Sequence, residues 1–222
     1  MTQFKAIIYQ LFFLITIIFF SNYIYAFDDN YPKNPKVNVL NYVFNIELSD
    51  NSDEINCEVI VDICFVGSGV KNLRLDLINV SRELDNKGMI VSEVSSDGSL
   101  LGFSHKNNEL IIQLPKPSLV NQFSKYKIKY KGIPQTGLII GKNKYGDRTF
   151  FSDNWPNLTR HWLATIDHPY DKAMCEFIVT APDDTEKSSA SKLAAPFADV
   201  LASAKFIVTS PLFPPPLRLV PA

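Results

Sequence analysis

Two long segments in which apolar and polar residues alternate constrain the fold more than any other feature of this chain. Over residues 39–48, alternate side chains point to opposite faces of the chain. One face carries Leu40, Tyr42, Phe44, Ile46 and Leu48, and the other carries Val39, Asn41, Val43 and Asn45. Over residues 55–65, one face carries Cys57, Val59, Val61, Ile63 and Phe65. A period of two residues is that of a half-buried β-strand, so both segments are predicted to be strands.

Shorter runs of the same kind follow at short and regular spacing. They predict strands over residues 73–77, 89–94, 100–105, 110–114, 126–130 and 173–181. Gly, Asn and Asp gather between these runs, where turns are expected. No segment before residue 185 has a convincing helical period. The pattern therefore predicts an all-β domain, built as an antiparallel sheet or a β-sandwich.

Residues 137–146 interrupt this pattern with glycines and lysines around a short apolar run. Such glycines occur in phosphate-binding loops, but there they lead into the start of a helix, and no helix start follows here. The segment is therefore predicted to be a loop whose glycines make turns.

The first 26 residues have the layout of a secretory signal peptide. Lys5 precedes an almost unbroken apolar run over residues 6–20, and a more polar stretch ends at Ala26. The run is shorter than the roughly 20 residues that a spanning helix needs. Cleavage after about Ala26 and a secreted or periplasmic location are therefore favoured. The alternative is an uncleaved anchor over residues 6–20, and only then is a membrane expected as partner.

The composition changes again near residue 185. Residues 185–222 form an atypical tail rich in alanine and proline, in which residues 193–204 fit a short helix and the prolines after 211 fit an extended, irregular end. Within this tail, Phe206–Pro211 nearly repeats Phe177–Pro182. The repeat is consistent with coincidence between two strand-like strings and also with a duplicated segment.

Charge and cysteine content limit the partners and the cross-links. The net charge is −1, which argues against a nucleic-acid partner and gives no reason to expect an anionic membrane surface. Export would permit disulfides, but Cys57 and Cys64 face opposite sides of one predicted strand. We therefore expect these two cysteines and Cys175 to be small buried side chains.

The residues that could carry chemistry are few. The three histidines, His105, His161 and His168, form no H-E-x-x-H pattern, and no G-x-S-x-G element is present. No catalytic residue and no metal ligand are therefore assigned. Asp153, Asp167 and Asp171 fit turn and capping roles, with paired carboxylates of a glycosidase as the remote alternative.

The segment 153–172 nevertheless carries the most structured group of polar residues. Arg160, close in sequence to Asp167, is expected to form an ion pair that fixes a turn. Pro169 is expected to make that turn, and Lys172 to follow it. All four are predicted to be structural residues of the turn.

This same segment resembles a known family. Arg160–Ala173 is similar to the Arg-x-x-x-Pro-x-x-Asp-Glu-Pro-x-x-Lys-Ala stretch of the aminopeptidase N family of zinc peptidases, and the strand Cys175–Pro182 resembles the strand that follows it. Gly132, Gly137-Leu138 and Trp155-Pro156 fall where that family has comparable residues. The resemblance implies that residues 31–184 are most of the saddle-like N-terminal β domain of such a peptidase, truncated before the catalytic domain.

The sequence also departs from the family pattern. His168 stands for the usual Glu and Ala164 for the usual Pro, and Trp155 stands where Glu or Gln helps to hold the amino group of the substrate. By resemblance, Asp153, Asn154 and Trp155 are the substrate-binding residues. The zinc of the family belongs to motifs of a later helical domain, so no cofactor is expected in residues 1–222.

Two functions follow as expectations. The first is an exported, non-catalytic β domain that in a full-length relative shapes the entrance for peptide substrates, with peptides or the missing catalytic domain as partners. The alternative is an independent exported module that binds peptides or proteins through an aromatic surface from Trp155 to Trp162. Whether the protein is an enzyme stays open: residues 1–222 as given carry no zinc motif, whereas the family they resemble consists of zinc-dependent aminopeptidases.

Overall fold

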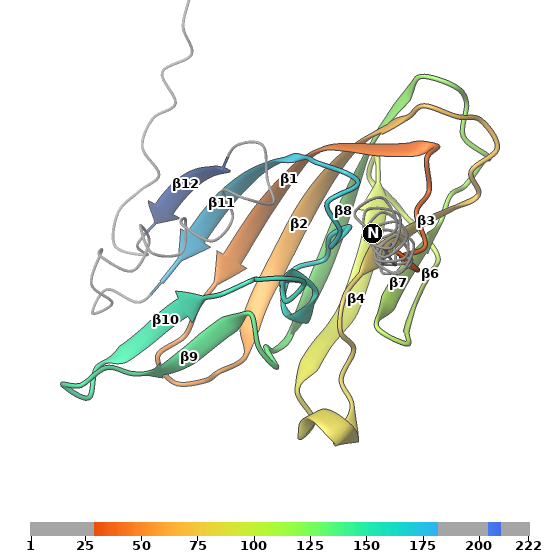
Figure 1. Ribbon diagram of the computed structural model, residues 1–222. Coiled ribbons are helices and arrows are strands. Elements are labelled where there is room, and N and C mark those ends of the chain that lie inside the picture. Colours follow the sequence, from red (N-terminus) through yellow and green to blue (C-terminus); the bar gives the residue numbers. More distant parts are fainter. Residues whose placement is uncertain (1–28, 182–203, 210–222) are drawn as a thin grey trace, which may run out of the picture. The chain divides into compact units, whose positions relative to one another are not determined.

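The computed structural model describes residues 29–181 and 204–209 (Figure 1). The chain divides into two units, residues 1–32 and residues 33–222, and all strands belong to the second unit. The predicted signal peptide lies outside the described residues, as does the predicted helix over 193–204 except for its last residue. Within the described ranges, no helix has the length and apolar character needed to cross a membrane.

A sheet of seven strands forms the main body of the second unit. In spatial order its strands are β12 (Ala204–Thr209), β11 (Met174–Thr180), β1 (Val37–Glu47), β2 (Ile55–Phe65), β8 (Gln122–Ile133), β4 (Gly88–Ser96) and β5 (Ser99–Leu100). Along the spatial order β1-β2-β8-β4-β5, each strand is antiparallel to its neighbour. β11 runs parallel to both of its neighbours, β1 and β12. The chain between β8 and β11 therefore has to return across the sheet, and residues 153–172 lie in this return.

Two smaller sheets complete the described part. One has the order β3-β7-β6, with β3 at Asn72–Asp76, β7 at Glu109–Gln113 and β6 at Phe103–Lys106. The other is the hairpin of β9 (Leu138–Lys142) and β10 (Arg148–Ser152). The helical segments of the described residues are two short 3-10 turns, η1 (Arg82–Leu84) and η2 (Thr159–His161). The prediction of an all-β fold is confirmed.

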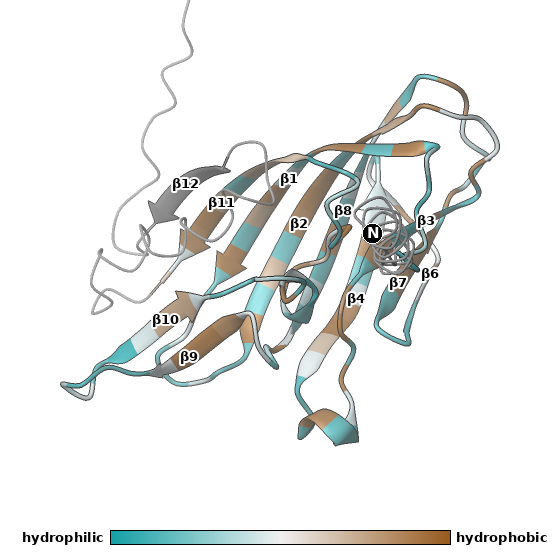
Figure 2. Cartoon of the chain, viewed as in Figure 1, coloured by the Kyte–Doolittle hydropathy of each residue, from teal (hydrophilic) through white to brown (hydrophobic). Residues whose placement is uncertain are grey.

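The inner face of the large sheet is apolar, because every second residue of its long strands points to that face. Cys57, Val59, Val61, Ile63 and Phe65 of β2 are all less than 5% exposed, as the period predicted. Phe44 stacks between Tyr42 and Phe177, with ring centroids 5.6 and 5.2 Å apart. Figure 2 shows the resulting alternation of apolar and polar bands along the central strands. Burial of one such aromatic side chain contributes about 1.5–3 kcal/mol.

The strand predicted over residues 39–48 is present as β1, but it begins two residues earlier, ends one residue earlier and has its faces reversed at the start. Val39 is 1% exposed and shares the buried face with Tyr42, whereas the sequence period placed these two residues on opposite faces. The reason is a β-bulge between Val39 and Asn41, where the register with β2 shifts by one residue. An extra residue in one strand reverses the faces of all residues before it.

Two further predictions were wrong. Residues 137–146 are not a loop throughout, because β9 occupies half of the segment and pairs with β10 in a hairpin. Residues 100–105 are not one strand, because β5 belongs to the seven-stranded sheet and β6 to the three-stranded sheet. The glycines do make turns as expected, since Gly137 and Gly146 have φ angles of +79° and +92°.

The outer face of the large sheet is charged. Lysines at alternate positions of β8 pair with acids on its neighbours and in the turn before β2: Lys125 with Asp62 (2.6 Å), Lys127 with Glu58 (3.0 Å), Lys129 with Glu93 (3.1 Å) and Lys131 with Glu54 (3.2 Å). These side chains are 29–62% exposed. Such pairs contribute little stability each, but together they mark this face as solvated.

The near-repeat in the sequence has a structural counterpart. β12 pairs with β11 in parallel, and four pairs of identical residues stand opposite one another: Phe177 and Phe206, Ile178 and Ile207, Val179 and Val208, Thr180 and Thr209. Part of the segment predicted as an irregular tail is therefore a strand that extends the sheet beyond β11.

The three cysteines are free and buried, as predicted. Burial raises the pKa of the Cys57 thiol to about 12, against an opposing hydrogen bond to Tyr130. Burial also raises the pKa of Cys175. Both thiols are therefore protonated and unreactive at neutral pH.

Candidate functional site

Residues 153–172 are fastened to the inner face of the large sheet by two tyrosines. The backbone N–H of Ile166 donates to the hydroxyl oxygen of Tyr42 in β1, at 3.0 Å. The N–H of Ala164 donates to the hydroxyl oxygen of Tyr130 in β8, at 3.3 Å. Residues 162–167 are all buried. The two phenols thus satisfy backbone groups that would otherwise be buried without partners.

A buried carboxylate holds the same segment against the three-stranded sheet. Asp76 ends β3 and is 0% exposed, and its Oδ2 accepts from the N–H of Asp167 at 2.9 Å. Its backbone exchanges two hydrogen bonds with Thr165, at 2.7 and 3.2 Å. Nothing in the local sequence around Asp76 signalled this role, because its partners lie about 90 residues further along the chain.

Two arginines balance the buried acids. Arg160 donates from Nε to Oδ2 of Asp167 at 3.0 Å and from Nη2 to the Asp167 carbonyl at 3.0 Å, and its Nη2 lies 3.8 Å from Oδ2 of Asp76. Arg74 binds Oδ1 of Asp76 at 2.6 Å and Glu109 at 2.9 Å. The expected ion pair of Arg160 with Asp167 is present, although it engages one carboxylate oxygen and a carbonyl rather than both carboxylate oxygens.

A turn at Pro169 follows this segment. Pro169 is exposed in a turn closed by the N–H of Asp171 and the carbonyl of His168, at 3.5 Å. Oδ2 of Asp171 accepts from the N–H of Val39 at 3.1 Å, next to the bulge of β1. Burial raises the pKa of Asp171, and this hydrogen bond opposes the shift. Lys172 is exposed.

The three residues assigned to substrate binding separate into two groups. Asn154 is 2% exposed, and its Oδ1 accepts from Nε1 of Trp162 at 2.9 Å, while its Nδ2 has no hydrogen-bond partner. Asp153 and Trp155 are exposed, and Oδ1 of Asp153 accepts from the N–H of Trp155 at 3.3 Å. Asn154 thus orients the loop, and its two neighbours face solvent.

The aromatic surface expected from Trp155 to Trp162 is not present in that form. Trp162 is 0% exposed, because its indole packs against Gly137 and its N–H is held by Asn154. A side chain at Gly137 would meet the carbonyl of Leu158 at 2.4 Å and the Trp162 ring at 2.9 Å, so only glycine fits there. Trp155, which is 74% exposed, remains at the surface.

Apolar side chains of the neighbouring hairpin are also exposed. Ile139 of β9 stands opposite Phe151 of β10, and they are 51% and 46% exposed. Sequence reasoning missed this pair because it assigned no strand to residues 137–146. Leu138 and Phe150 point inward and Ile139 and Phe151 outward, but all four are apolar, so the sequence pattern does not show which of them are exposed.

The described residues do not fit a zinc ion. No group of three or more His, Cys, Asp or Glu within residues 29–181 is arranged to hold a metal. Nε2 of His105 lies 2.9 Å from the Leu77 carbonyl, and burial lowers its pKa. Burial and the neighbouring Arg160 lower the pKa of His161 as well. Nδ1 of His161 is buried without a hydrogen-bond partner, and no step is assigned to a metal.

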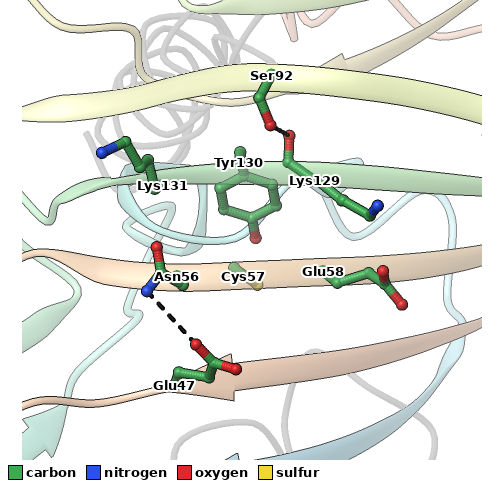
Figure 3. Close-up of a pocket in the computed structure, with 8 residues that line it drawn as sticks. All are labelled: Glu47, Asn56, Cys57, Glu58, Ser92, Lys129, Tyr130 and Lys131. Atoms are coloured by element: carbon green, nitrogen blue, oxygen red, sulfur yellow. Dashed lines mark hydrogen bonds between the residues drawn. The ribbon is translucent and has the colours of Figure 1, made fainter.

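A pocket of about 260 Å³ lies across β1, β2, β8 and β4 (Figure 3). It is lined by Glu47, Asn56, Cys57, Glu58, Ser92, Lys129, Tyr130 and Lys131. In Figure 3 the Tyr130 hydroxyl points toward Cys57, and a hydrogen bond of 3.4 Å joins Asn56 to Glu47. The lysines are paired with acids and the Cys57 thiol is protonated, so the pocket offers no activated nucleophile.

Comparison with known proteins gives a fold likeness. No family model and no curated protein matches the chain. A two-domain M1 zinc metallopeptidase bound to L-tryptophan matches with a TM-score of 0.55 and 19% identity, over 67% of this chain and 34% of its own. An M1 zinc metallopeptidase from Deinococcus radiodurans matches with a TM-score of 0.55 and 20% identity, over 66% and 33%.

A third solved structure extends the likeness. Leukotriene A4 hydrolase from Saccharomyces cerevisiae matches with a TM-score of 0.54 and 19% identity, over 66% of this chain and 23% of its own. The chain thus spans about a third or less of the length of these proteins. The resemblance read from Arg160–Ala173 is confirmed at the level of fold, and the described residues share their β architecture with part of the M1 zinc metallopeptidases.

Proposed function

We propose that residues 31–184 serve as the exported β domain of a zinc aminopeptidase-like protein and form one wall of its peptide entrance. The fold likeness to M1 zinc metallopeptidases supports this role, as does the length of the match, which leaves two thirds or more of those proteins for other domains. Export is part of the proposal and rests on the signal-peptide layout of residues 1–26.

One observation carries the proposal: the loop at Asp153–Trp155 is held rigidly while two of its side chains remain at the surface. Asn154 and Trp162 fix the loop from inside, and Arg160, Asp76 and Asp167 fix the segment behind it. A carboxylate and an indole presented from a rigid support form a suitable site for a cation. The carboxylate of Asp153 attracts an ammonium group, and the face of Trp155 favours a cation or an apolar side chain.

The substrate group that fits this pair is the free amino terminus of a peptide. The proposed role is to orient that end at the entrance, since no group in the described residues is equipped for bond cleavage. Trp155 takes the place of the Glu or Gln expected there by resemblance, so Asp153 supplies the charge in this proposal.

Binding of a fluorescent peptide by the full chain tests the proposal. A peptide with a free amino terminus should bind about two- to fivefold more tightly than its N-acetylated form, the range of one exposed ion pair. Asp153→Asn should remove the difference, and Asp85→Asn, which removes another exposed carboxylate, should leave it intact. Equal binding of the two peptides by the parent chain would reject the proposal.

An independent module that binds peptides or proteins remains a second candidate function, now with a different set of exposed side chains as its surface. The exposed apolar side chains of Ile139, Phe151 and Trp155 favour it, with Trp155 taking the place of the buried Trp162. This hypothesis predicts saturable binding that is insensitive to N-acetylation and is lost in Trp155→Ala. Tyr145→Ala, which removes an aromatic side chain of similar exposure (76% against 74%), is the matched control.

A further inference from the structure

Four apolar side chains are exposed together at one end of the large sheet, where the chain after β2 meets the chain before β8. Val66, Leu119, Val120 and Phe123, here called the apolar tip, are 45%, 69%, 58% and 72% exposed. Val66 directly follows Phe65, and Phe123 stands opposite Cys64 in the register of β2 and β8. The apolar tip plays no part in the entrance proposed above.

The apolar tip is held in place by the buried side chain of Ser118. Its hydroxyl donates to the Gly67 carbonyl at 2.9 Å and accepts from the N–H of Val70 at 3.0 Å. Its carbonyl accepts from the N–H of Gly69 at 2.8 Å. On the other side, the N–H of Asn121 donates to the Phe65 carbonyl at 2.8 Å. Leu119 and Val120 lie between these two anchors, so their exposure is a fixed feature of the loop.

The surroundings of the apolar tip are positively charged. Segments 33–38, 63–75 and 110–124 converge there and contain no Asp or Glu. Their exposed lysines include Lys36, Lys71 and Lys116. Lys36 lies at the loop itself, with its Nζ donating to the Ser68 carbonyl at 3.1 Å. The net charge of −1 conceals this local excess, because the paired acids lie along the middle of the sheet.

We propose that the apolar tip docks on an anionic membrane surface. Leu119, Val120 and Phe123 enter the boundary between headgroups and acyl chains, and the three lysines contact anionic headgroups. Exposed aliphatic and aromatic side chains with lysines around them complement such a surface, and the neighbouring acid of β2, Asp62, is paired with Lys125 at 2.6 Å. A protein partner is the less favoured occupant, because it would have to offer a matching apolar cleft with an acidic rim.

A fluorophore placed at the apolar tip tests the proposal in the full chain. Val120→Cys is labelled with a polarity-sensitive dye, which reacts with the new exposed thiol because the native thiols are buried. Tyr145→Cys, at a residue that is 76% exposed in the turn between β9 and β10, carries the same dye as control. Since both proteins contain residues 6–20, adsorption through that apolar run affects them equally.

The expected result is an increase in fluorescence at position 120, and not at position 145, on addition of mixed phosphatidylcholine–phosphatidylglycerol vesicles. Lys71→Gln and Lys116→Gln should each lower the apparent partition coefficient about fivefold, and Lys87→Gln, at another exposed lysine, should not. An equal response at both positions would overturn the proposal. So would a response at position 120 that is the same with phosphatidylcholine alone, or no response to either vesicle, which would leave the apolar tip to a protein partner.

Discussion

Nε of Arg160 lies 3.0 Å from Oδ2 of Asp167, seven residues further along the chain, and the same carboxylate oxygen accepts from the Arg160 N–H at 3.1 Å. This pair closes the loop that carries η2. Because Asp167 also donates its N–H to Asp76 at 2.9 Å, the closed loop is fastened to β3. Trp162, within this loop, donates its indole N–H to Asn154, which stands between Asp153 and Trp155.

Asp76→Asn should strongly destabilise the protein. The substitution leaves Arg74 and Arg160 facing a neutral amide at a site that is 0% exposed, so the free energy of unfolding should fall by about 3 kcal/mol. Glu109→Gln, which removes a 39% exposed partner of Arg74, should cost less than about 1 kcal/mol. Urea unfolding measures both, and equal losses would show that Asp76 has no special role.

Asn154→Ala should weaken the loop from inside. It removes the acceptor of the buried Trp162 N–H, and an unsatisfied buried donor costs about 1–3 kcal/mol. Asn157→Ala, an exposed neighbour, should have little effect. In a double-mutant cycle with Trp162→Phe, the two substitutions should be coupled by about 1 kcal/mol. Additive losses in the cycle would mean that the hydrogen bond does not contribute.

Acidification should destabilise the protein through His105. Burial lowers the pKa of His105 below its ordinary value of 6.5, so the unfolded chain binds the proton more tightly than the folded one. The contribution to stability is therefore fully present above pH 6.5 and is lost as the pH falls through the folded pKa. His105→Gln should reduce the loss of unfolding free energy between about pH 7.5 and about pH 5. An unchanged pH dependence in this variant would contradict the assignment.

The native thiols should resist alkylation. Burial raises the pKa of Cys57 to about 12 and also raises that of Cys175, and all three cysteines are buried and free. Mass spectrometry after iodoacetamide treatment should find no modified cysteine in the folded chain and three in urea. Rapid modification of Cys57 in the folded chain would show that the inner face of β2 opens to solvent.

The large sheet could be predicted well because its signal is local. The alternation over residues 55–65 gave the bounds and the buried face of β2. The bulge at Leu40 could not be predicted from the sequence, since Val39 and Leu40 are both apolar and either residue fits the inner face of the sheet. The hairpin of β9 and β10 was missed because glycine and lysine content outweighed a short apolar run in the prediction.

The site was predictable in part, for a similar reason. Arg160 and Asp167 are close in sequence, so their ion pair could be expected from the local pattern. Asp76, Tyr42 and Tyr130 lie 34 to 124 residues from the backbone groups they bind, and no local pattern signals contacts over such separations. The burial of Trp162 depends on Gly137 and Asn154, which only the folded chain brings together.

The zinc content and peptidase activity of the purified full chain test the central claim most directly. If residues 1–222 hold a β domain without catalytic residues of its own, metal analysis should find far less than one zinc per folded chain. Aminoacyl-anilides should then show no hydrolysis above the buffer blank. One zinc per chain, with turnover that a chelator abolishes and added zinc restores, would contradict the account.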